Sequence, residues 1–194
     1  MDDPMPIFDY TAGTPWVQSP ELTTRMMEAQ EQGEPVAEAW SRTDVELLRN
    51  NERYGNRFRA RFEKAGVDVI SVTLGSRVEP ARPYPDRVRR DLARWQARFD
   101  SLDWLRKVTG PEEAMAVAAS GDVGIVLNTQ NLGRAIDGDL SRIKELYDAG
   151  VLVMQLTYNR QNLLGTGCTD YSNGGTIGIR PGCARRNRAA WSHP

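Results

Sequence analysis

Polar side chains follow two apolar stretches near the middle of the sequence. Gln130 and Asn131 come directly after the run GIVLNT, and Tyr158 and Asn159 end the run VLVMQLTYN. Parallel strands end in loops that carry chemistry, and the carboxyl ends of neighbouring parallel strands meet at one edge of the sheet. If both runs are parallel strands, we expect these four residues to lie side by side at that edge.

Other arrangements of catalytic residues find little support in the sequence. There is no serine nucleophile elbow, and the single histidine, His193, is the penultimate residue, a poor position for a member of a triad. The loop GTGCTDYSNGG lacks the lysine of a phosphate-binding loop. Asp137 and Asp139 flank a glycine before a helical pattern, where capping explains them better than acid-base catalysis. Cys168 and Cys183 are too few for a disulfide framework.

The surrounding pattern predicts alternating strands and helices. Both apolar runs lack the alternation of a half-exposed strand, and a short amphipathic pattern, LSRIKELYDAG, separates them, as in a β-α-β unit of a parallel sheet. Upstream, apolar residues recur at helical spacing in two segments, and a β-branched run lies between glycines. We predict strands over residues 7–15, 67–74, 124–129 and 151–159, helices over 43–65, 86–107, 111–121 and 140–150, and a proline-rich loop over 75–86. This order predicts an α/β fold with parallel strands and right-handed crossovers.

Composition bounds the classes of partner. The 194 residues carry a net charge of -1, which gives no field that would select nucleic acid or an anionic membrane. No run approaches the roughly 18 apolar residues of a transmembrane span, and the acidic start MDDPMPIF does not resemble a signal peptide. We expect a cytoplasmic protein that binds neither nucleic acid nor membrane.

The phrases LNTQN and AGVLVMQLTYNRQNLLGTGC, followed by a loop containing Gly-Gly, resemble the central segment of the membrane (renal-type) dipeptidase family of zinc metallopeptidases and its bacterial relatives. The resemblance covers Gly124 to about Gly175. It implies a (β/α)8 barrel that hydrolyses dipeptides with two zinc ions, and the predicted elements amount to about four of its eight units. It also places Tyr158 and Asn159 at substrate-contacting positions.

The same resemblance places Thr11, Gly13 and Gln130 at positions that hold metal in the family. Threonine is a poor zinc ligand at neutral pH, glycine has no side chain, and glutamine cannot supply the charge of a bridging carboxylate. We therefore expect zinc as the family's cofactor but no tight zinc site in this chain.

The family resemblance and the change in character after Gly175 divide the chain into residues 1–175, the amino-terminal half of a dipeptidase-like barrel, and an irregular basic tail over 176–194. The tail has four arginines and no acid. It can be a charged surface segment, a disordered terminus or an out-of-frame translation, since a shift of one base can turn its start into a family-like phrase. A half-barrel leaves an open edge strand, which predicts self-association.

Two functions remain open at the level of sequence. The first is a metallodipeptidase-like hydrolase, truncated and inactive as it stands, that still recognises a dipeptide or another small molecule. The second is a non-catalytic α/β domain that binds a small ligand or a partner at the edge formed by Gln130 and Tyr158.

Overall fold

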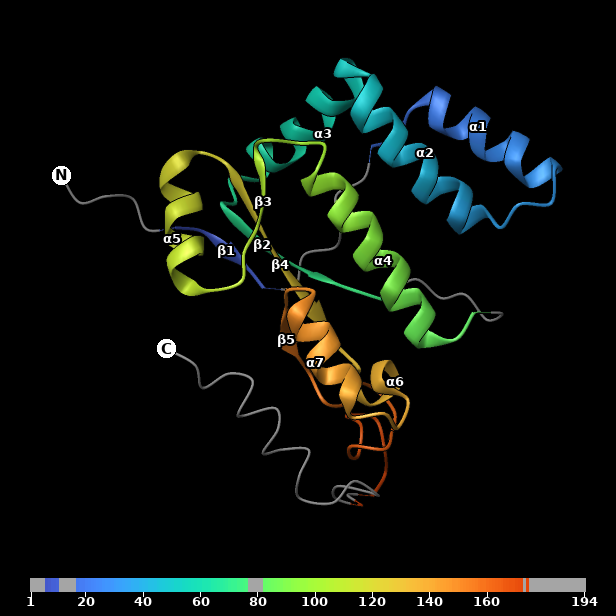
Figure 1. Ribbon diagram of the computed structural model, residues 1–194, viewed down its shortest axis with the longest axis vertical. Coiled ribbons are helices and arrows are strands. Elements are labelled where there is room, and N and C mark those ends of the chain that lie inside the picture. The colour runs from blue at the N-terminus through green and yellow to red at the C-terminus, as the bar shows by residue number, and fades with distance from the viewer. Residues whose placement is uncertain (1–5, 11–16, 77–81, 173, 175–194) are drawn as a thin grey trace.

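The computed structural model describes residues 6–10, 17–76, 82–172 and 174, which form an open parallel sheet with helices packed on it (Figure 1). The thin grey segments in Figure 1 lie outside this range; they include Thr11, Gly13, His193 and the predicted tail. The elements in chain order are β1 (Phe8–Asp9), α1 (Pro20–Glu31), α2 (Val36–Asn50), α3 (Glu52–Ala65), β2 (Val69–Thr73), α4 (Tyr84–Phe99), β3 (Leu105–Lys107), α5 (Pro111–Ser120), β4 (Val123–Thr129), α6 (Leu132–Ile136), α7 (Ser141–Asp148) and β5 (Val151–Met154).

Strand β4 lies at the centre of the sheet, and all its neighbours run parallel to it. One edge of β4 pairs with β2, which pairs in turn with β1. The other edge is shared: β3 pairs with its first residues, from Val123 to Ile125, and β5 with its last, from Leu127 to Thr129. Every residue of β4 is buried, which explains why its sequence is apolar without alternation. The predicted α/β class, a partial barrel of parallel strands with covering helices, is confirmed.

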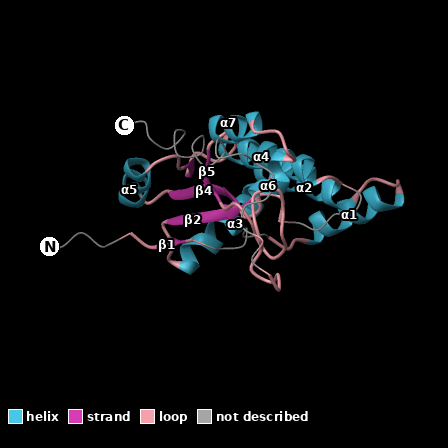
Figure 2. Cartoon of the chain, turned by 90° about the horizontal axis from the view of Figure 1, so that it is seen from below, coloured by secondary structure: helices cyan, strands magenta, loops and turns pink. Residues whose placement is uncertain are grey.

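The two faces of the sheet are covered unequally. Ile70, Val72, Ile125 and Leu127 belong to the main core, together with apolar side chains of α2, α3, α4, α6 and α7. The opposite face has a smaller cluster around Val126, where α5 supplies Val117. Figure 2 shows β1, β2, β4 and β5 side by side, with α5 near one end of the strands. The main core therefore lies between the sheet and its helices, on the face that corresponds to the outside of a barrel.

The predicted helix over 43–65 was wrong, because two helices occupy this stretch and α2 starts earlier. Asn51 has extended backbone angles between α2 and α3. Its side chain accepts a hydrogen bond from the amide of Tyr54 (3.0 Å), so it caps the start of α3. Apolar periodicity continues across the break, since Leu47 and Phe58 are both buried in one core. The pattern alone therefore hides the break.

The predicted helix over 86–107 was also too long. Helix α4 starts at Tyr84, because Pro85 suits a first turn, and ends at Phe99. Residues Leu105–Lys107 form β3 instead, and this strand pairs with the start of β4. Burial of Trp104 and Leu105 in the core fixes the short connection. Helix α1, by contrast, lies in a stretch to which the sequence patterns assigned no element.

A buried ionic network ties three helices together. Arg98 on α4 and Asp44 on α2 are both fully buried, and Arg98 forms an ion pair with Oδ2 of Asp44. The hydroxyl of Tyr54 on α3 donates a hydrogen bond to the other oxygen, Oδ1 (2.9 Å). The Arg98 guanidinium lies between two rings, 4.6 Å from Trp95 and 5.2 Å from Phe58. This network belongs to the helix layer and is remote in sequence from the predicted binding edge.

Candidate substrate-binding edge

The carboxyl ends of β4 and β5 are joined by backbone hydrogen bonds to the start of α6. The amide of Gln155 donates to Thr129 O (2.9 Å), and the amides of Leu132 and Gly133 donate to the carbonyls of Gln155 (2.9 Å) and Leu156 (3.3 Å). The first amides of a helix have no partner within it, so residues 155 and 156 satisfy them. This explains why β5 ends at Met154, whereas the sequence predicted a strand to Asn159.

One side chain, Asn162, holds the loop after β5 against the residue after β4. Its Nδ2 donates to Asn131 Oδ1 (2.7 Å) and to Leu156 O (2.9 Å), while its Oδ1 accepts from the amide of Leu164 (2.7 Å). Gly133 makes this contact possible, because a Cβ there would lie only 2.4 Å from the amide group of Asn162. The structure thus brings Asn131 next to the loop that follows β5. Asn162 itself was not singled out from the sequence, although the asparagine repeat in NRQN was a usable signal.

The predicted substrate-contacting residues lie further along the same loop. The Tyr158 carbonyl accepts from the amide of Cys168 (2.9 Å), and the Asn159 carbonyl accepts from the amide and hydroxyl of Thr169 (3.0 and 2.5 Å). These bonds fold residues 158–169 into a closed loop. Tyr158 is 45 % exposed, so part of its side chain is open to solvent.

A polar network lies on the inner face of the sheet, and Gln130 comes directly after β4, one of the strands that carry it. Asn128 donates from Nδ2 to Ser71 Oγ (2.7 Å) and accepts at Oδ1 from Thr73 Oγ1 (3.0 Å). Ser71 and Asn128 are buried. Gln130 is half-buried and lies two residues after Asn128, so the alternation of side chains along a strand places both on the same face. This network was not predicted from the sequence, although polar residues two apart within apolar strands indicate such an arrangement.

A cleft of about 620 Å³ opens beside this edge, on the helix side of the sheet. The start of α4 supplies Tyr84, α6 supplies Arg134, its C-cap is Asp137, and the loop after β5 supplies Gln161 and Asn162. The Tyr84 hydroxyl is 3.3 Å from Leu74 O at the end of β2. Burial raises the pKa of Tyr84, and the nearby guanidinium groups of Arg87 and Arg134 oppose that rise. The ring is therefore neutral at pH 7.

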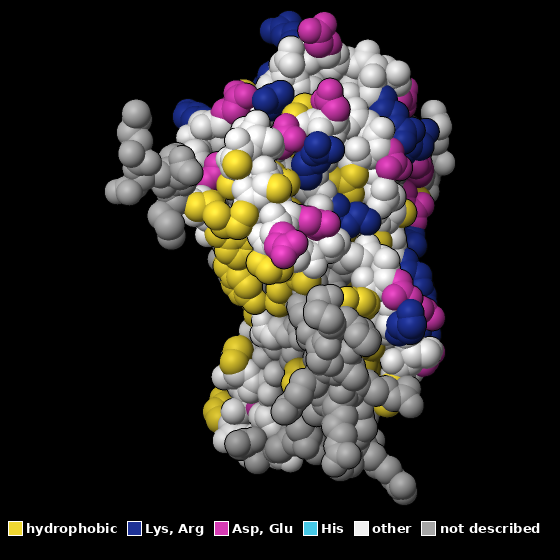
Figure 3. All heavy atoms as spheres, turned by 60° about the vertical axis from the view of Figure 1, so that its left-hand side comes forward, with side chains coloured by type: hydrophobic (Ala, Val, Ile, Leu, Met, Phe, Trp, Pro, Cys, Tyr) yellow, Lys and Arg dark blue, Asp and Glu magenta, His cyan; other side chains and the backbone are white. Residues whose placement is uncertain are grey.

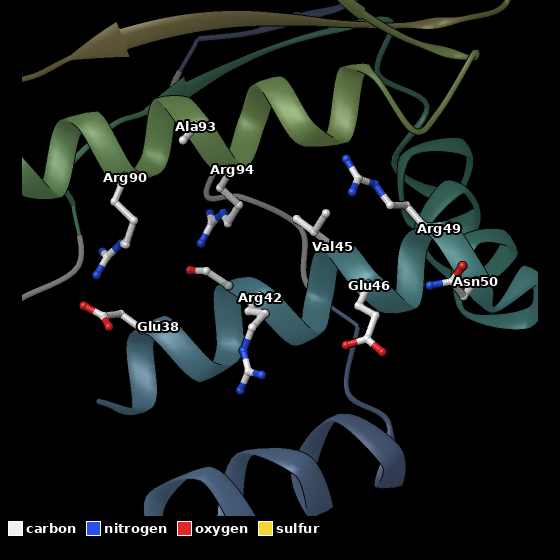
Figure 4. A pocket seen from close by; sticks show the side chains of 10 residues that line it. Glu38, Arg42, Val45, Glu46, Arg49, Asn50, Arg90, Ala93 and Arg94 are labelled. Atoms are coloured by element: carbon white, nitrogen blue, oxygen red, sulfur yellow. The ribbon is translucent and has the colours of Figure 1, made fainter. Parts of the chain in front are cut away.

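A second hollow, of about 520 Å³, lies between α2 and α4 (Figure 4). Its charged side chains already interact with other residues: Glu38 pairs with Arg82, Glu46 with Arg25 (2.8 Å) and Arg42 with Glu34 (2.7 Å). Arg94 lies over the Trp40 ring, at 4.6 Å. We therefore interpret this hollow as an ion-paired contact between helices.

The described residues do not fit a two-zinc site. Among them, no group of three or more His, Cys, Asp or Glu side chains is placed to hold a metal ion. Thr11 and Gly13 lie outside the described range, and Gln130, which the family resemblance places at the bridging position, offers a neutral amide oxygen in place of a negative charge. We derive no catalytic step through zinc. Within the described residues, none of the helices combines the length and hydrophobicity that a membrane span requires.

Comparison with known proteins identifies the class of fold. No protein-family model and no curated protein matches the sequence. Solved structures do match, among them two hydrolases. An amidohydrolase from Pseudomonas aeruginosa aligns with a TM-score of 0.57 at 19% identity, over 95% of this chain and 42% of its own. The dipeptidase AC, a metallopeptidase, aligns with a TM-score of 0.57 at 12% identity, over 84% of this chain and 45% of its own. The chain therefore shares its fold with part of these two structures and spans less than half of their length.

Proposed function

We propose that the chain is the amino-terminal half of a dipeptidase-like hydrolase barrel, and that it binds a dipeptide or a similar small molecule at the carboxyl edge of its sheet. The observation that carries this proposal is the fold likeness to two hydrolases, one of them a dipeptidase, over most of the chain. The ordered geometry of this edge adds support, since Asn162 binds Asn131 through one hydrogen bond and fixes its own loop through two more. In this proposal Tyr158 and Asn159 contact the ligand.

The proposal does not extend to turnover by the described residues. Hydrolysis of a peptide bond needs an activated water and a group that stabilises the developing negative charge. In the barrel family suggested by the sequence, metal ions supply both, whereas Gln130 is neutral. We therefore propose that the edge recognises its ligand and that this chain is inactive by itself.

The alternative is a non-catalytic binding domain on the same fold. The neutral side chains of Gln130, Asn131 and Tyr158 favour it, because they can donate and accept hydrogen bonds without acting as strong acids or bases. In this case the same ligand binds and no product forms under any condition.

One experiment separates turnover from recognition alone. The purified chain is incubated with a panel of dipeptides, with and without added zinc, while free amino acids and the melting temperature are recorded. Turnover that a chelator abolishes favours a hydrolase and contradicts inactivity of the chain. Thermal stabilisation without turnover favours recognition alone. If neither occurs, both functions are wrong.

The residues are tested with matched tyrosine variants. Tyr158→Ala should reduce the stabilisation by a dipeptide, whereas Tyr171→Ala, at a fully exposed tyrosine of the same loop region, should leave it unchanged. Equal effects of both substitutions would contradict a specific role for Tyr158.

A further inference from the structure

The guanidinium of Arg134 has no carboxylate partner within the described part of the chain. It projects from α6 into the 620 Å³ cleft and lies over the Tyr84 ring, 5.4 Å from the ring centre. Arg87 lies 4.8 Å from the same ring. The ring thus orients Arg134 but supplies no negative charge, and a flat guanidinium held in this way suits a carboxylate.

Asp137, three residues after Arg134 in the chain, provides the opposite charge. It caps the end of α6 in a left-handed conformation, with φ of 49°, and is the sole non-glycine residue with positive φ among the described residues. The neighbouring cation, Arg142, is used elsewhere: it contacts Ile136 O (3.2 Å) and the carboxylate of Asp139 (3.7 Å). No ion pair of Asp137 is found within the described residues, and its carboxylate lines the cleft.

Another part of the cleft wall is preformed. Asn162 uses its amide in three hydrogen bonds, and Gly133 packs directly against it. The cleft also has apolar lining from Pro83, Pro85 and Leu163. Its volume is within the usual range for small-molecule sites, of about 300–1,000 Å³. A ligand can therefore bind here without first paying for ordering of the wall.

We propose that this cleft binds a small zwitterion such as a dipeptide, with the ligand's carboxylate on Arg134 and its ammonium group on Asp137. Both side chains line the same cleft, from positions three apart in the chain, so two separate charges of one small molecule can reach both. The site differs from the edge residues Tyr158 and Asn159 and does not depend on hydrolysis.

The test uses glycyl-leucine and two blocked forms, glycyl-leucinamide without the carboxylate and N-acetyl-glycyl-leucine without the ammonium group. Affinities are measured by calorimetry on the full chain. Glycyl-leucine should bind about tenfold more tightly than either blocked form, since each loses one charge-assisted interaction. Arg134→Gln should erase the preference over the amide and keep the preference over the acetylated form. Asp137→Asn should do the reverse, and asparagine tolerates the left-handed conformation.

Two control variants make the same changes of charge at positions away from the cleft. Arg106→Gln on β3 and Asp148→Asn on α7 should leave both preferences unchanged. Each conclusion compares two affinities of the same variant, so a partly unfolded sample does not imitate the expected result.

The inference is overturned if glycyl-leucine shows no saturable binding, if the blocked forms bind as tightly as the free dipeptide, or if Arg134→Gln and Asp137→Asn keep both preferences. Should Tyr158→Ala abolish dipeptide binding while Arg134→Gln has no effect, this cleft is excluded and the function proposed for the edge stands.

Discussion

The guanidinium of Arg98 donates two hydrogen bonds to a single oxygen of Asp44, from Nε at 3.1 Å and from Nη2 at 2.5 Å, with both side chains buried. This contact joins α4 to α2 across 54 residues of sequence. Within the described residues Arg98 Nη1 has no hydrogen-bond partner, so the guanidinium depends on Asp44 and on the flanking rings.

Removing one partner of this pair should be costly. Asp44→Ala leaves a buried positive charge without compensation, and we expect a loss of about 3–5 kcal/mol in the free energy of unfolding. The double variant Asp44→Leu with Arg98→Leu should recover part of that loss, because neither charge remains. Urea unfolding measures both; a double variant less stable than Asp44→Ala would contradict the argument.

Alkaline pH should destabilise the fold through two tyrosines. Burial, with the negative charge of Asp44, raises the pKa of Tyr54, and burial raises the pKa of Tyr84. A group whose pKa is raised on folding holds its proton longer in the native state, so stability is complete below the ordinary pKa of about 10 and falls as pH rises above it. The melting temperature of Tyr54→Phe should fall less steeply above pH 10 than that of the unsubstituted chain. Parallel curves would show that Tyr54 plays no part.

The contact of Asn162 with Gly133 predicts two destabilising substitutions at the edge. Asn162→Ala removes three hydrogen bonds, including those to Asn131 Oδ1 and from the Leu164 amide, so we expect a loss of about 1–3 kcal/mol. Gly133→Ala forces its Cβ into the Asn162 amide and should also destabilise. Gly110→Ala is a control with open space around the Cβ. Equal unfolding midpoints for Gly133→Ala and Gly110→Ala would refute the close contact.

Metal removal should leave the fold unchanged. The described residues offer no group of three metal-binding side chains, so treatment with a chelator should not shift the melting temperature. Metal analysis after purification should find well under two equivalents of zinc. A chelator-dependent drop in melting temperature would mean that residues outside the described range complete a site.

The outer edge of β1 predicts self-association. Phe8 is 48 % exposed and Ile7 56 % exposed, and Figure 3 shows hydrophobic side chains gathered on one face of the molecule. A short edge strand with apolar side chains can pair with another chain. Phe8→Lys should lower the apparent mass in sedimentation at high protein concentration, whereas Lys64→Glu at an exposed site should not. A monomer at all concentrations would exclude this edge as an interface.

Apolar runs and their order predicted the parallel sheet, because strands buried on both faces leave a strong signal in Val69–Thr73 and Val123–Thr129. The details that failed depend on contacts distant in sequence. The end of β5 is set by amides of α6, β3 exists because β4 offers it an edge, and the division of α2 from α3 rests on the cap of Asn51. The cleft at Arg134 could not be predicted for the same reason, since Tyr84 reaches it from a helix 50 residues earlier.

The shared edge of β4 has a consequence for folding. Three strands, β2, β3 and β5, take their alignment from β4. A one-residue slip of β4 would misplace β2, β3 and β5 together and turn Asn128 from the inner face into the helix core. Gly124 is tightly packed between neighbouring side chains, because a Cβ there would lie 2.9 Å from Val108 and 3.1 Å from Val69. Amide exchange should accordingly be slowest along β4, and any variant that loosens this strand should release the whole sheet at once.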